Sequence, residues 1–384
     1  MNEDKSTKYQ RLKRQASLIS LAWGIVLLAG LVWTGGHVAL RDAAEAAVPA
    51  ALPPALRSGA IVFVYVALLS IVNELVTLPL GFYSGFVLER RYELSNETLG
   101  AWLRDQVKSF AIGLVFAGGA AEAIYWCIRR SPVDWWISAG LIFTLLIVGL
   151  TNVAPVILLP LFYSVKPLSR DALRTRLLGL AERAGARVLG AYEWGLGGKT
   201  RKANAALAGL GATRRILVSD TMLAEYSDDE IEVVLAHEIA HHVHGDIWKG
   251  IVFESALIVA GFYLASRVLA ALGGAAGLRG VDDVAGLPLL LLAAGAVSIV
   301  MVPAAHAMSR AFERRADRFA LELTQNPVAF ISAMRRLGAQ NLAEQDPSRI
   351  VQWLFYSHPP MAARIAAARE VSSKKLEIRS TSNL

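Results

Sequence analysis

The residues best suited to chemistry are His237, Glu238 and His241, which form an H-E-x-x-H pattern. Positions four apart in a helix lie on the same face, so both imidazoles can bind one metal ion. The glutamate beside the first histidine can accept a proton from a water that the metal activates. A chance match in a chain of this length has a probability on the order of one per cent. The pattern therefore predicts a catalytic metal site rather than two unrelated surface histidines.

A catalytic zinc site usually has three protein ligands, and three residues are candidates for the third. His244 shares a helix face with His237, but it lies roughly 10 Å further along the axis, too far to share one ion. His306 lies inside an apolar stretch, where a lone histidine is more often a polar contact within a helix bundle. Glu313 precedes Asp317 by one helical turn, and Asp317 can accept the free N–H of a ligand histidine. The predicted ligands of one zinc ion per chain are His237, His241 and Glu313.

Glu313 and Asp317 also have an alternative interpretation as members of surface ion pairs. Three arginines lie one turn or less away on the same predicted helix, and such pairs are common on helix surfaces. The upstream H-E-x-x-H pattern favours metal ligation over this alternative. The arginines in question are Arg310, Arg314 and Arg318.

Peptide hydrolysis also needs groups that bind the developing oxyanion and the substrate backbone. His358 lies in a loop stiffened by Pro359 and Pro360, and Arg364 follows it. We predict that His358 and Arg364 contact the oxyanion or the substrate, although both could serve only to start a helix. Asn204 lies in a predicted edge strand, which can pair with an extended peptide, or it is a simple loop amide.

The composition indicates that this site belongs to a membrane protein. The chain is 54% hydrophobic and only 18% charged, which departs from the profile of soluble globular proteins. The single cysteine, Cys127, excludes an intramolecular disulfide and a cysteine-rich metal site. The net charge of +7 is explained by basic faces beside anionic lipid and does not require a nucleic acid partner. Six stretches are long and apolar enough to span a bilayer, at 17–36, 60–87, 110–128, 135–162, 251–272 and 284–308.

The distribution of positive charge predicts the topology. Five lysines and arginines precede the first span, which places the N-terminus in the cytoplasm and favours an uncleaved anchor over a signal peptide. Alternation then puts both large polar regions, about 164–249 and 309–384, in the cytoplasm. The expected units are residues 1–163 with four spans, 164–249 with the catalytic helix, 250–312 with two spans, and 313–384 with the third ligand.

The first polar region is predicted to mix helices and strands. Residues 171–184 form an amphipathic pattern, and strands at 201–207 and 215–219 are joined by a turn at Gly209-Leu210-Gly211. Ser227 and Glu230 form a capping box at the start of the helix that carries the H-E-x-x-H. The predicted fold is mainly α, a multi-pass membrane protein with a small α+β zincin-like domain.

In combination, these motifs resemble the type I CAAX prenyl protease family of integral-membrane zinc metalloproteases. The segment 78–89, Asn204-Ala205 with Arg215-Ile216, and the order of the metal and loop motifs carry the resemblance. It implies zinc on the three predicted ligands, Glu238 as general base, Asp317 behind the ligands, and substrate contacts from His358, Arg364 and Asn204. It also implies a ring of helices around an internal chamber, with the zinc at its cytoplasmic end. Four charged residues within the spans would face chamber water: Glu74, Glu122, Glu254 and Arg267.

We therefore expect an integral-membrane zinc metalloendopeptidase that acts on membrane-associated peptides or proteins, with CAAX-type C-terminal proteolysis implied by resemblance. The resembled eukaryotic proteins have seven spans and this chain has six, and the loss of one N-terminal helix agrees with a cytoplasmic N-terminus. The short, alanine-rich chain suggests a prokaryotic plasma-membrane protein. One alternative is a membrane-protein quality-control protease without prenyl dependence. A more distant alternative is a transporter or scaffold with a structural metal.

Overall fold

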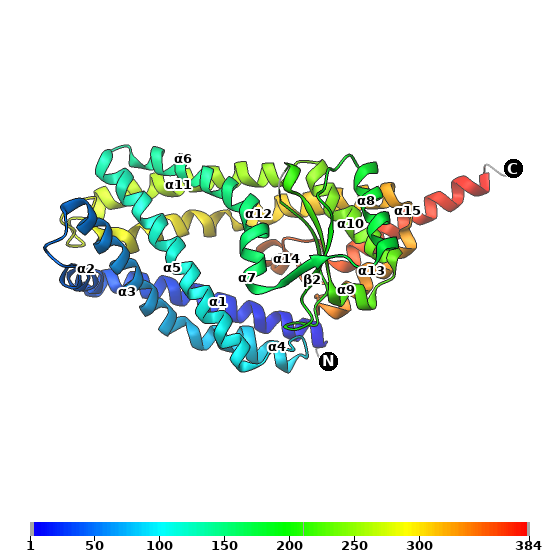
Figure 1. Cartoon of the computed structure of the whole chain (residues 1–384), viewed down its shortest axis with the longest axis horizontal. Coiled ribbons are helices and arrows are strands. Elements are labelled where there is room, and N and C mark those ends of the chain that lie inside the picture. Colours follow the sequence, from blue (N-terminus) through cyan, green and yellow to red (C-terminus); the bar gives the residue numbers. More distant parts are fainter. Residues whose placement is uncertain (1–3, 210, 382–384) are drawn as a thin grey trace.

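The computed structural model describes residues 4–209 and 211–381, and long helices gather at one end of it (Figure 1). A small sheet with shorter helices forms the other end. The predicted six spans and the mainly helical fold are confirmed for the described residues. The membrane-length helices are α1 (Lys5–Thr34), α3 (Pro54–Phe82), α5 (Leu99–Arg130), α6 (Trp135–Val153), α11 (Asp246–Leu272) and α12 (Leu287–Thr324).

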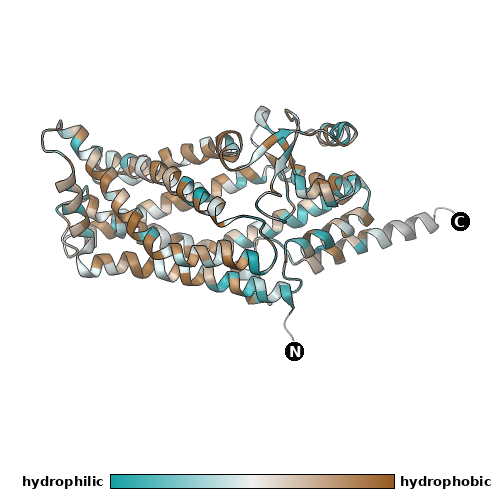
Figure 2. Ribbon diagram, turned by 60° about the horizontal axis from the view of Figure 1, so that its bottom comes forward, coloured by the Kyte–Doolittle hydropathy of each residue, from teal (hydrophilic) through white to brown (hydrophobic). Residues whose placement is uncertain are grey.

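Apolar residues run along these long helices, whereas the sheet-bearing end is mixed in character (Figure 2). Many large apolar side chains on the long helices point outward. Leu75 is 69% exposed and Val300 is 74% exposed, values that suit contact with lipid rather than water. The long helices therefore form the membrane part of the chain.

Two of the membrane helices change their winding before they end. The α3 helix passes into the π-helix η1 (Tyr83–Val87) and then α4 (Leu88–Arg91). The predicted span 135–162 is regular only through α6 and continues as the π-helix η2 (Ala154–Leu158) and α7 (Leu159–Phe162). The π-helix η2 contains Pro155, which lacks the N–H that a regular α-helix needs, and Pro79 precedes η1 by four residues.

The sheet has four strands in the order β1-β2-β4-β3, so β3 lies at an edge. Its strands are β1 (Ser164–Pro167), β2 (Ala191–Gly195), β3 (Ala205–Ala208) and β4 (Arg215–Ser219). β3 and β4 form the predicted antiparallel hairpin, with Ala205 opposite Val218, whereas Leu210 of the predicted turn lies outside the described residues. The first predicted strand was to begin at residue 201, but β3 begins four residues later. The backbone of the intervening residues bonds to neighbouring loops and side chains instead.

The helix with the H-E-x-x-H, α10 (Asp228–Val243), lies at the centre of this end of the molecule. The predicted capping box starts it: Ser227 and Glu230 each bond to the backbone N–H of the other. Ile231, Leu235 and Ile239 on α10 are completely buried. The surrounding helices are α8 (Asp171–Arg183), α9 (Asp220–Glu225), α13 (Pro327–Gln340), α14 (Arg349–Phe355) and α15 (Met361–Thr381).

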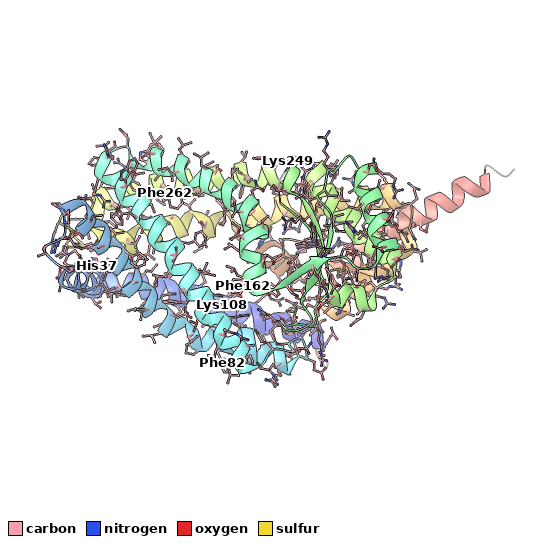
Figure 3. All side chains as sticks on the ribbon, in the orientation of Figure 1. His37, Phe82, Lys108, Phe162, Lys249 and Phe262 are labelled. Atoms are coloured by element: carbon pink, nitrogen blue, oxygen red, sulfur yellow. The ribbon has the colours of Figure 1, made fainter. Side chains whose placement is uncertain are left out.

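The N-terminal half of α1 joins the membrane helices to the sheet-bearing end. Tyr9 donates a hydrogen bond of 2.6 Å to Glu89, which also pairs with Lys13 and Lys202 at 2.9 Å each. On another side, Lys108 of α5 lies 5.9 Å from the centre of the Phe162 ring in α7 (Figure 3). These contacts hold the helices at a fixed position relative to the sheet.

The far end of the helices is tied together by α2 (Gly36–Ala47). The Arg41 guanidinium binds Asp283 at 2.6 Å, and both side chains are buried. His37, at the same end in Figure 3, has its ring nitrogens 2.9 Å from the carbonyl oxygens of Leu31 and Ala276. Polar contacts thus close the helices at the end opposite the sheet.

Between the two ends, the helices border open space beside a buried apolar core that includes Tyr65, Ile128 and Trp135. Two adjoining cavities of about 870 and 690 Å³ lie among α1, α3, α5 and α12. Glu74 lines both, as the resemblance implied, and accepts a 2.8 Å hydrogen bond from Gln106. Glu254 and Arg267 are exposed and line neither cavity, while Glu122 binds Arg129 at 2.6 Å.

Candidate metal centre and active site

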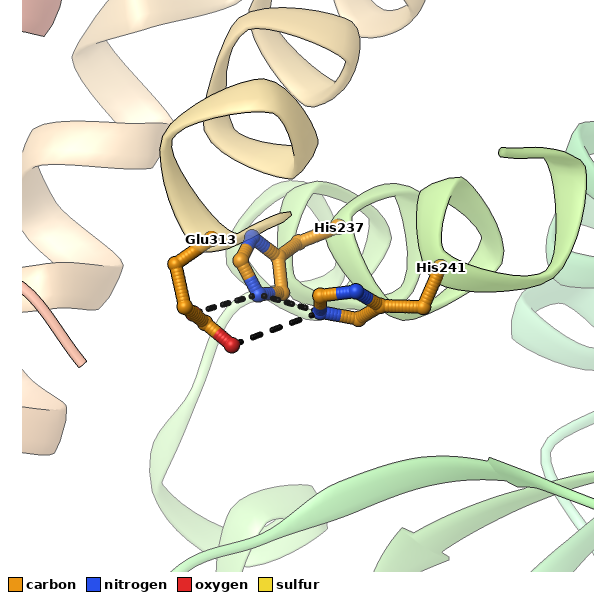
Figure 4. A group of neighbouring side chains, drawn as sticks. All are labelled: His237, His241 and Glu313. Atoms are coloured by element: carbon orange, nitrogen blue, oxygen red, sulfur yellow. Dashed lines mark hydrogen bonds and ion pairs between the residues drawn. The ribbon is translucent and has the colours of Figure 1, made fainter. Parts of the chain in front are cut away.

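The structure brings the three predicted metal ligands together at the junction of α10 and α12 (Figure 4). One ligand atom from each of His237, His241 and Glu313 lies within 4.8 Å of the other two. The two Nε2 atoms are 3.3 Å apart, and the Glu313 oxygens lie 3.2 Å from His237 Nε2 and 3.5 Å from His241 Nε2. This is a compact donor set for a single ion.

The orientation of the two imidazoles fits a bound cation. His237 Nδ1 lies 2.9 Å from Asp317, and His241 Nδ1 lies 3.1 Å from Asp246. A proton on each Nδ1 satisfies these carboxylates and leaves lone pairs on both Nε2 atoms. Two facing lone pairs and a carboxylate repel one another unless a positive charge lies between them. The donor set therefore fits zinc, which is commonly bound by two histidines and one glutamate in catalytic sites.

Asp246 was not identified from the sequence. It follows His241 by five residues and begins α11 directly after Gly245, which has a φ of +67°. The turn at this glycine carries the chain from α10 into α11 and brings the carboxylate back toward the imidazole. The sequence did contain a signal for this contact. Gly245 allows a turn soon after the H-E-x-x-H helix, and the acidic Asp246 follows that glycine directly.

The structure does not show Glu313 in a surface ion pair with the nearby arginines. Glu313 is 5% exposed, and its Oε2 atom is buried without a hydrogen-bond donor. Arg310 points elsewhere and donates to the carbonyl oxygens of Gln352 and Tyr356. A buried carboxylate oxygen without a donor, aimed at two imidazoles, is what a metal ligand requires.

The two rejected candidates for the third ligand lie away from the cluster. Among the described residues, the metal-binding group contains neither His244 nor His306. The His244 ring packs at 5.4 Å against Phe319. The separation along the helix axis correctly excluded His244 as a third ligand.

Glu238 lines the same cleft as the ligands His237 and Glu313. Burial raises the pKa of the Glu238 carboxyl above its ordinary value. Burial alone would lower the pKa of His237, but the carboxylates of Asp317 and Glu313 beside the ring outweigh it and raise that pKa to about 9. The cluster therefore attracts positive charge, and a poised carboxyl group stands beside it.

His358 approaches the ligands from the loop between α14 and α15. Its Nε2 lies 3.3 Å from Glu313 Oε1, and its Nδ1 lies 2.9 Å from the Ser357 hydroxyl. When Ser357 donates to Nδ1, the proton of the neutral ring remains on Nε2 and faces the site. The geometry gives His358 a donor directed at the metal centre.

Arg364 is held behind the ligands by a bond that the sequence did not predict. It is 7% exposed and forms a bidentate pair with Asp317, at 2.8 Å and 2.5 Å. Its Nη2 also lies 3.4 Å from His237 Nδ1. The guanidinium thus fixes the carboxylate that orients His237, and it also lines the cleft.

A cleft of about 350 Å³ opens onto the ligands and extends along the edge strand β3. Asn204 and Ala205 line it, and the Asn204 side chain is exposed. Met222, Met334 and Leu337 give it an apolar floor. The cleft therefore places an unpaired strand edge and the metal centre against the same volume.

Comparisons with known proteins agree with this geometry. A model described as "CAAX prenyl protease N-terminal, five membrane helices" matches residues 2–164, where the described structure has four membrane-length helices. A model described as "Peptidase family M48" matches residues 167–372. These two matches cover nearly the whole chain.

Individual relatives extend over most of the chain as well. The metalloprotease YhfN of Bacillus subtilis is 32% identical over 94% of this chain and 84% of its own length. CAAX prenyl protease 1 of Saccharomyces cerevisiae is 27% identical over 81% of this chain and 72% of its own length. The crystal structure of S. mikatae Ste24p is similar in fold, with a TM-score of 0.82, 24% identity, and 95% and 87% of the two chains covered.

The transporter or scaffold hypothesis is set aside, because M48 is a family of peptidases. The multiple membrane-length helices and the matched N-terminal model account for the other half of the chain. The chain belongs to peptidase family M48 and is an integral-membrane metalloprotease.

Proposed function

We propose that this protein is a zinc endopeptidase that cleaves membrane-associated peptides near their C-termini, as in CAAX processing, on the cytoplasmic side of a prokaryotic plasma membrane. The observation that carries the proposal is the convergence of His237, His241 and Glu313 where α10 meets α12. The α12 helix spans the bilayer, and α10 leads through Gly245 into another span. The site therefore lies at the membrane surface.

Each residue of the site has a proposed role in hydrolysis. Zinc bound by the three ligands would polarise the substrate carbonyl and lower the pKa of a water. Glu238 accepts a proton from the attacking water and returns it to the leaving amine. His358 donates a hydrogen bond to the developing oxyanion. Asp317 and Asp246 fix the ring orientation of the two histidines, and Arg364 holds Asp317 in place.

The cytoplasmic location is supported by charge. Lysines and arginines precede the first span, and α1 begins beside the sheet-bearing end (Figure 1). Because positive residues are retained on the cytoplasmic side, the end with the metal centre is the cytoplasmic one. Testing accessibility of an engineered cysteine in the 309–384 region, in right-side-out and inverted vesicles, would check the side. Labelling from outside the cell would contradict it.

The catalytic proposal is tested with purified protein in detergent. We expect about one zinc per chain and cleavage of a peptide that ends in a prenylated C-a-a-X sequence. Glu238→Gln should retain zinc and lose cleavage by a factor of about a thousand. Activity that survives this substitution would rule out the mechanism.

Prenyl dependence separates the proposed function from a quality-control protease. The match of residues 2–164 to the CAAX prenyl protease N-terminal model favours the former. Prenylated and unprenylated versions of one peptide should then differ in KM far more than in kcat, because the lipid contributes binding rather than chemistry. Equal cleavage of both versions would favour the alternative.

A further inference from the structure

The free edge of β3 is shorter than the strand itself, and this limits how a peptide can pair with it. Ser219 N–H donates to the Asn204 carbonyl at 2.9 Å, so Asn204 is turned toward β4. By alternation, the backbone groups of Ala203, Ala205 and Leu207 are turned outward. These outward groups are the ones an extended peptide could use.

Two side chains already occupy part of that edge. Asn341, at the end of α13, accepts from Ala203 N–H at 3.1 Å and donates to Ala203 C=O at 3.2 Å. Its amide thus makes the two bonds that a paired peptide group would make. His242 lies 2.7 Å from the Leu207 carbonyl. Within the described chain, the outward groups left over are both groups of Ala205 and the N–H of Leu207.

The segment before β3 is closed in the same way. Gln340, next to Asn341, donates to the carbonyl of Arg201 at 2.8 Å. Thr221 donates to the carbonyl of Lys202 at 2.8 Å. A peptide that continued along the chain past Ala203 would find the Arg201 carbonyl taken as well, while the Lys202 carbonyl is bonded on the β4 side. The edge therefore ends at Asn341.

The wall behind Asn341 is also held in place. The next residue, Leu342, has a φ of +48° and accepts a 2.8 Å hydrogen bond from Gln10 of α1. Glu344 in the same loop is bound by Tyr356 at 2.6 Å and by Arg14. Gln10, Asn341 and Glu344 all line the cleft. The N-terminal helix thus braces this end of the cleft.

We propose that Asn341 is a positioning residue that limits how many substrate residues can follow the scissile bond. A peptide that pairs antiparallel to β3, the more stable arrangement, has its C-terminal side directed toward Ala203. The two-residue step from Ala205 to Ala203 leaves room for about 7 Å of extended chain before Asn341. Cleavage is therefore restricted to bonds near a C-terminus. This proposal rests on the proposed peptidase function.

The test uses the zinc-loaded protein in detergent and two series of peptides that share one cleaved core. One series is lengthened on the C-terminal side and the other on the N-terminal side, and products are identified by mass. In the native protein, kcat/KM should fall about tenfold once more than about two residues follow the scissile bond. Lengthening the N-terminal side should have little effect.

Variants of Asn341 separate positioning from general damage. Asn341→Ala opens Ala203 for pairing, so the loss on long C-terminal sides should shrink to less than about threefold. Asn341→Asp fills the same space, keeps the acceptor for Ala203 N–H and should retain the limit. The matched control is Asn326→Ala, which removes the cap at the other end of α13 and should leave the length profile unchanged.

Each outcome has a distinct meaning. If the native protein cleaves no peptide, the proposed function fails. If it cleaves the short core but shows no length limit, or if the limit falls on the N-terminal side, the role of Asn341 is overturned alone. A limit that persists in Asn341→Ala, with all rates lowered equally, would show that the residue is merely structural.

Discussion

The sheet-bearing end and the membrane helices differ in how completely their interiors are packed. Around α10, side chains such as Leu177, Ile231 and Phe330 are completely buried, and one continuous core joins the strands to α13. Among the membrane helices, two cavities lie between α1 and its neighbours, and only 6% of the most apolar part of α1 is buried. The sheet-bearing end is packed throughout, whereas the membrane helices combine a buried core with open space beside α1.

The difference follows from the two solvents. Water drives apolar side chains together at the sheet-bearing end, whereas lipid tails give helices no such reason to close on one another. The helices share one buried apolar cluster, and polar contacts join their ends, through Arg41 and Asp283 at one end and Glu89 at the other. An open interior can therefore coexist with a metal site whose groups are fixed by close packing.

The largest expected effect comes from removing a metal ligand, which should stop catalysis while leaving both regions folded. Glu313→Gln should lose zinc and reduce peptide cleavage by more than about a thousandfold. Zinc content by mass spectrometry and initial rates would check this. Glu322→Gln, near the exposed end of the same helix, is the control and should keep both. Full activity in the Glu313 variant would show that Glu313 is not a metal ligand.

The next largest effect should be a loss of stability among the membrane helices that leaves the metal centre intact. Arg41→Met leaves Asp283 buried without its partner and should cost about 3–5 kcal/mol of stability. Thermal unfolding in detergent should shift accordingly, while cleavage at low temperature persists. Arg279→Met removes exposed ion pairs in the same region and should cost less than about 1 kcal/mol. Equal losses of stability in the two variants would argue against a stabilising buried ion pair between Arg41 and Asp283.

A smaller effect should loosen the metal centre without changing either region's packing. Asp246→Asn weakens the bond that orients His241 and should lower zinc affinity by about 10–100-fold. Competition with a chelator measures this directly. Arg315→Gln removes an ion pair of Asp246 but keeps the bond to His241, so its zinc affinity should change little. An unchanged affinity in Asp246→Asn would show that the imidazole is oriented by packing alone.

The smallest expected effect is a pH-dependent change in the stability of the sheet-bearing end. Burial alone would raise the pKa of Glu230, but hydrogen bonds from Ser332 and Ser227, together with the nearby Arg336 guanidinium, hold it below the ordinary carboxyl value. Its stabilisation is therefore present above the unfolded carboxyl pKa and is lost as pH falls through the lower folded value. Glu230→Gln should unfold at a lower temperature than the native protein at neutral pH. The two melting temperatures should converge as the solution is acidified, and a gap that is constant with pH would contradict this.

Much of the fold could be predicted because its signals are local. Long apolar runs indicate spans, Ser227 and Glu230 mark a helix start, and the glycines between the two predicted strands indicate a hairpin. The ligand set could be predicted because His237 and His241 share a helix face. Glu313 was harder, since it is distant in sequence, but its spacing to Asp317 and its position after an apolar span were informative.

The remaining contacts depend on how distant segments approach one another. Asp246 reaches His241 only because Gly245 turns the chain, and Asn341 reaches Ala203 only because α13 ends beside the sheet. Arg364 was predicted to touch substrate, yet its guanidinium is bound to Asp317. Neither periodicity nor composition specifies these pairings, because many polar residues of the same type occur in equivalent sequence contexts.

The unbroken course of α12 determines the depth at which a substrate must present its bond. Glu313 lies about 39 Å along the axis from Leu287, where the helix begins, whereas the hydrocarbon core of a bilayer is about 30 Å thick. One continuous helix, with Pro303 inside it, therefore sets the height of the third ligand above the lipid. A bond carried by a lipid-anchored chain reaches that height only when the spacing between anchor and bond matches it. For the lipid-anchored substrates proposed above, the distance between the membrane and the scissile bond would then be a property by which α12 selects them.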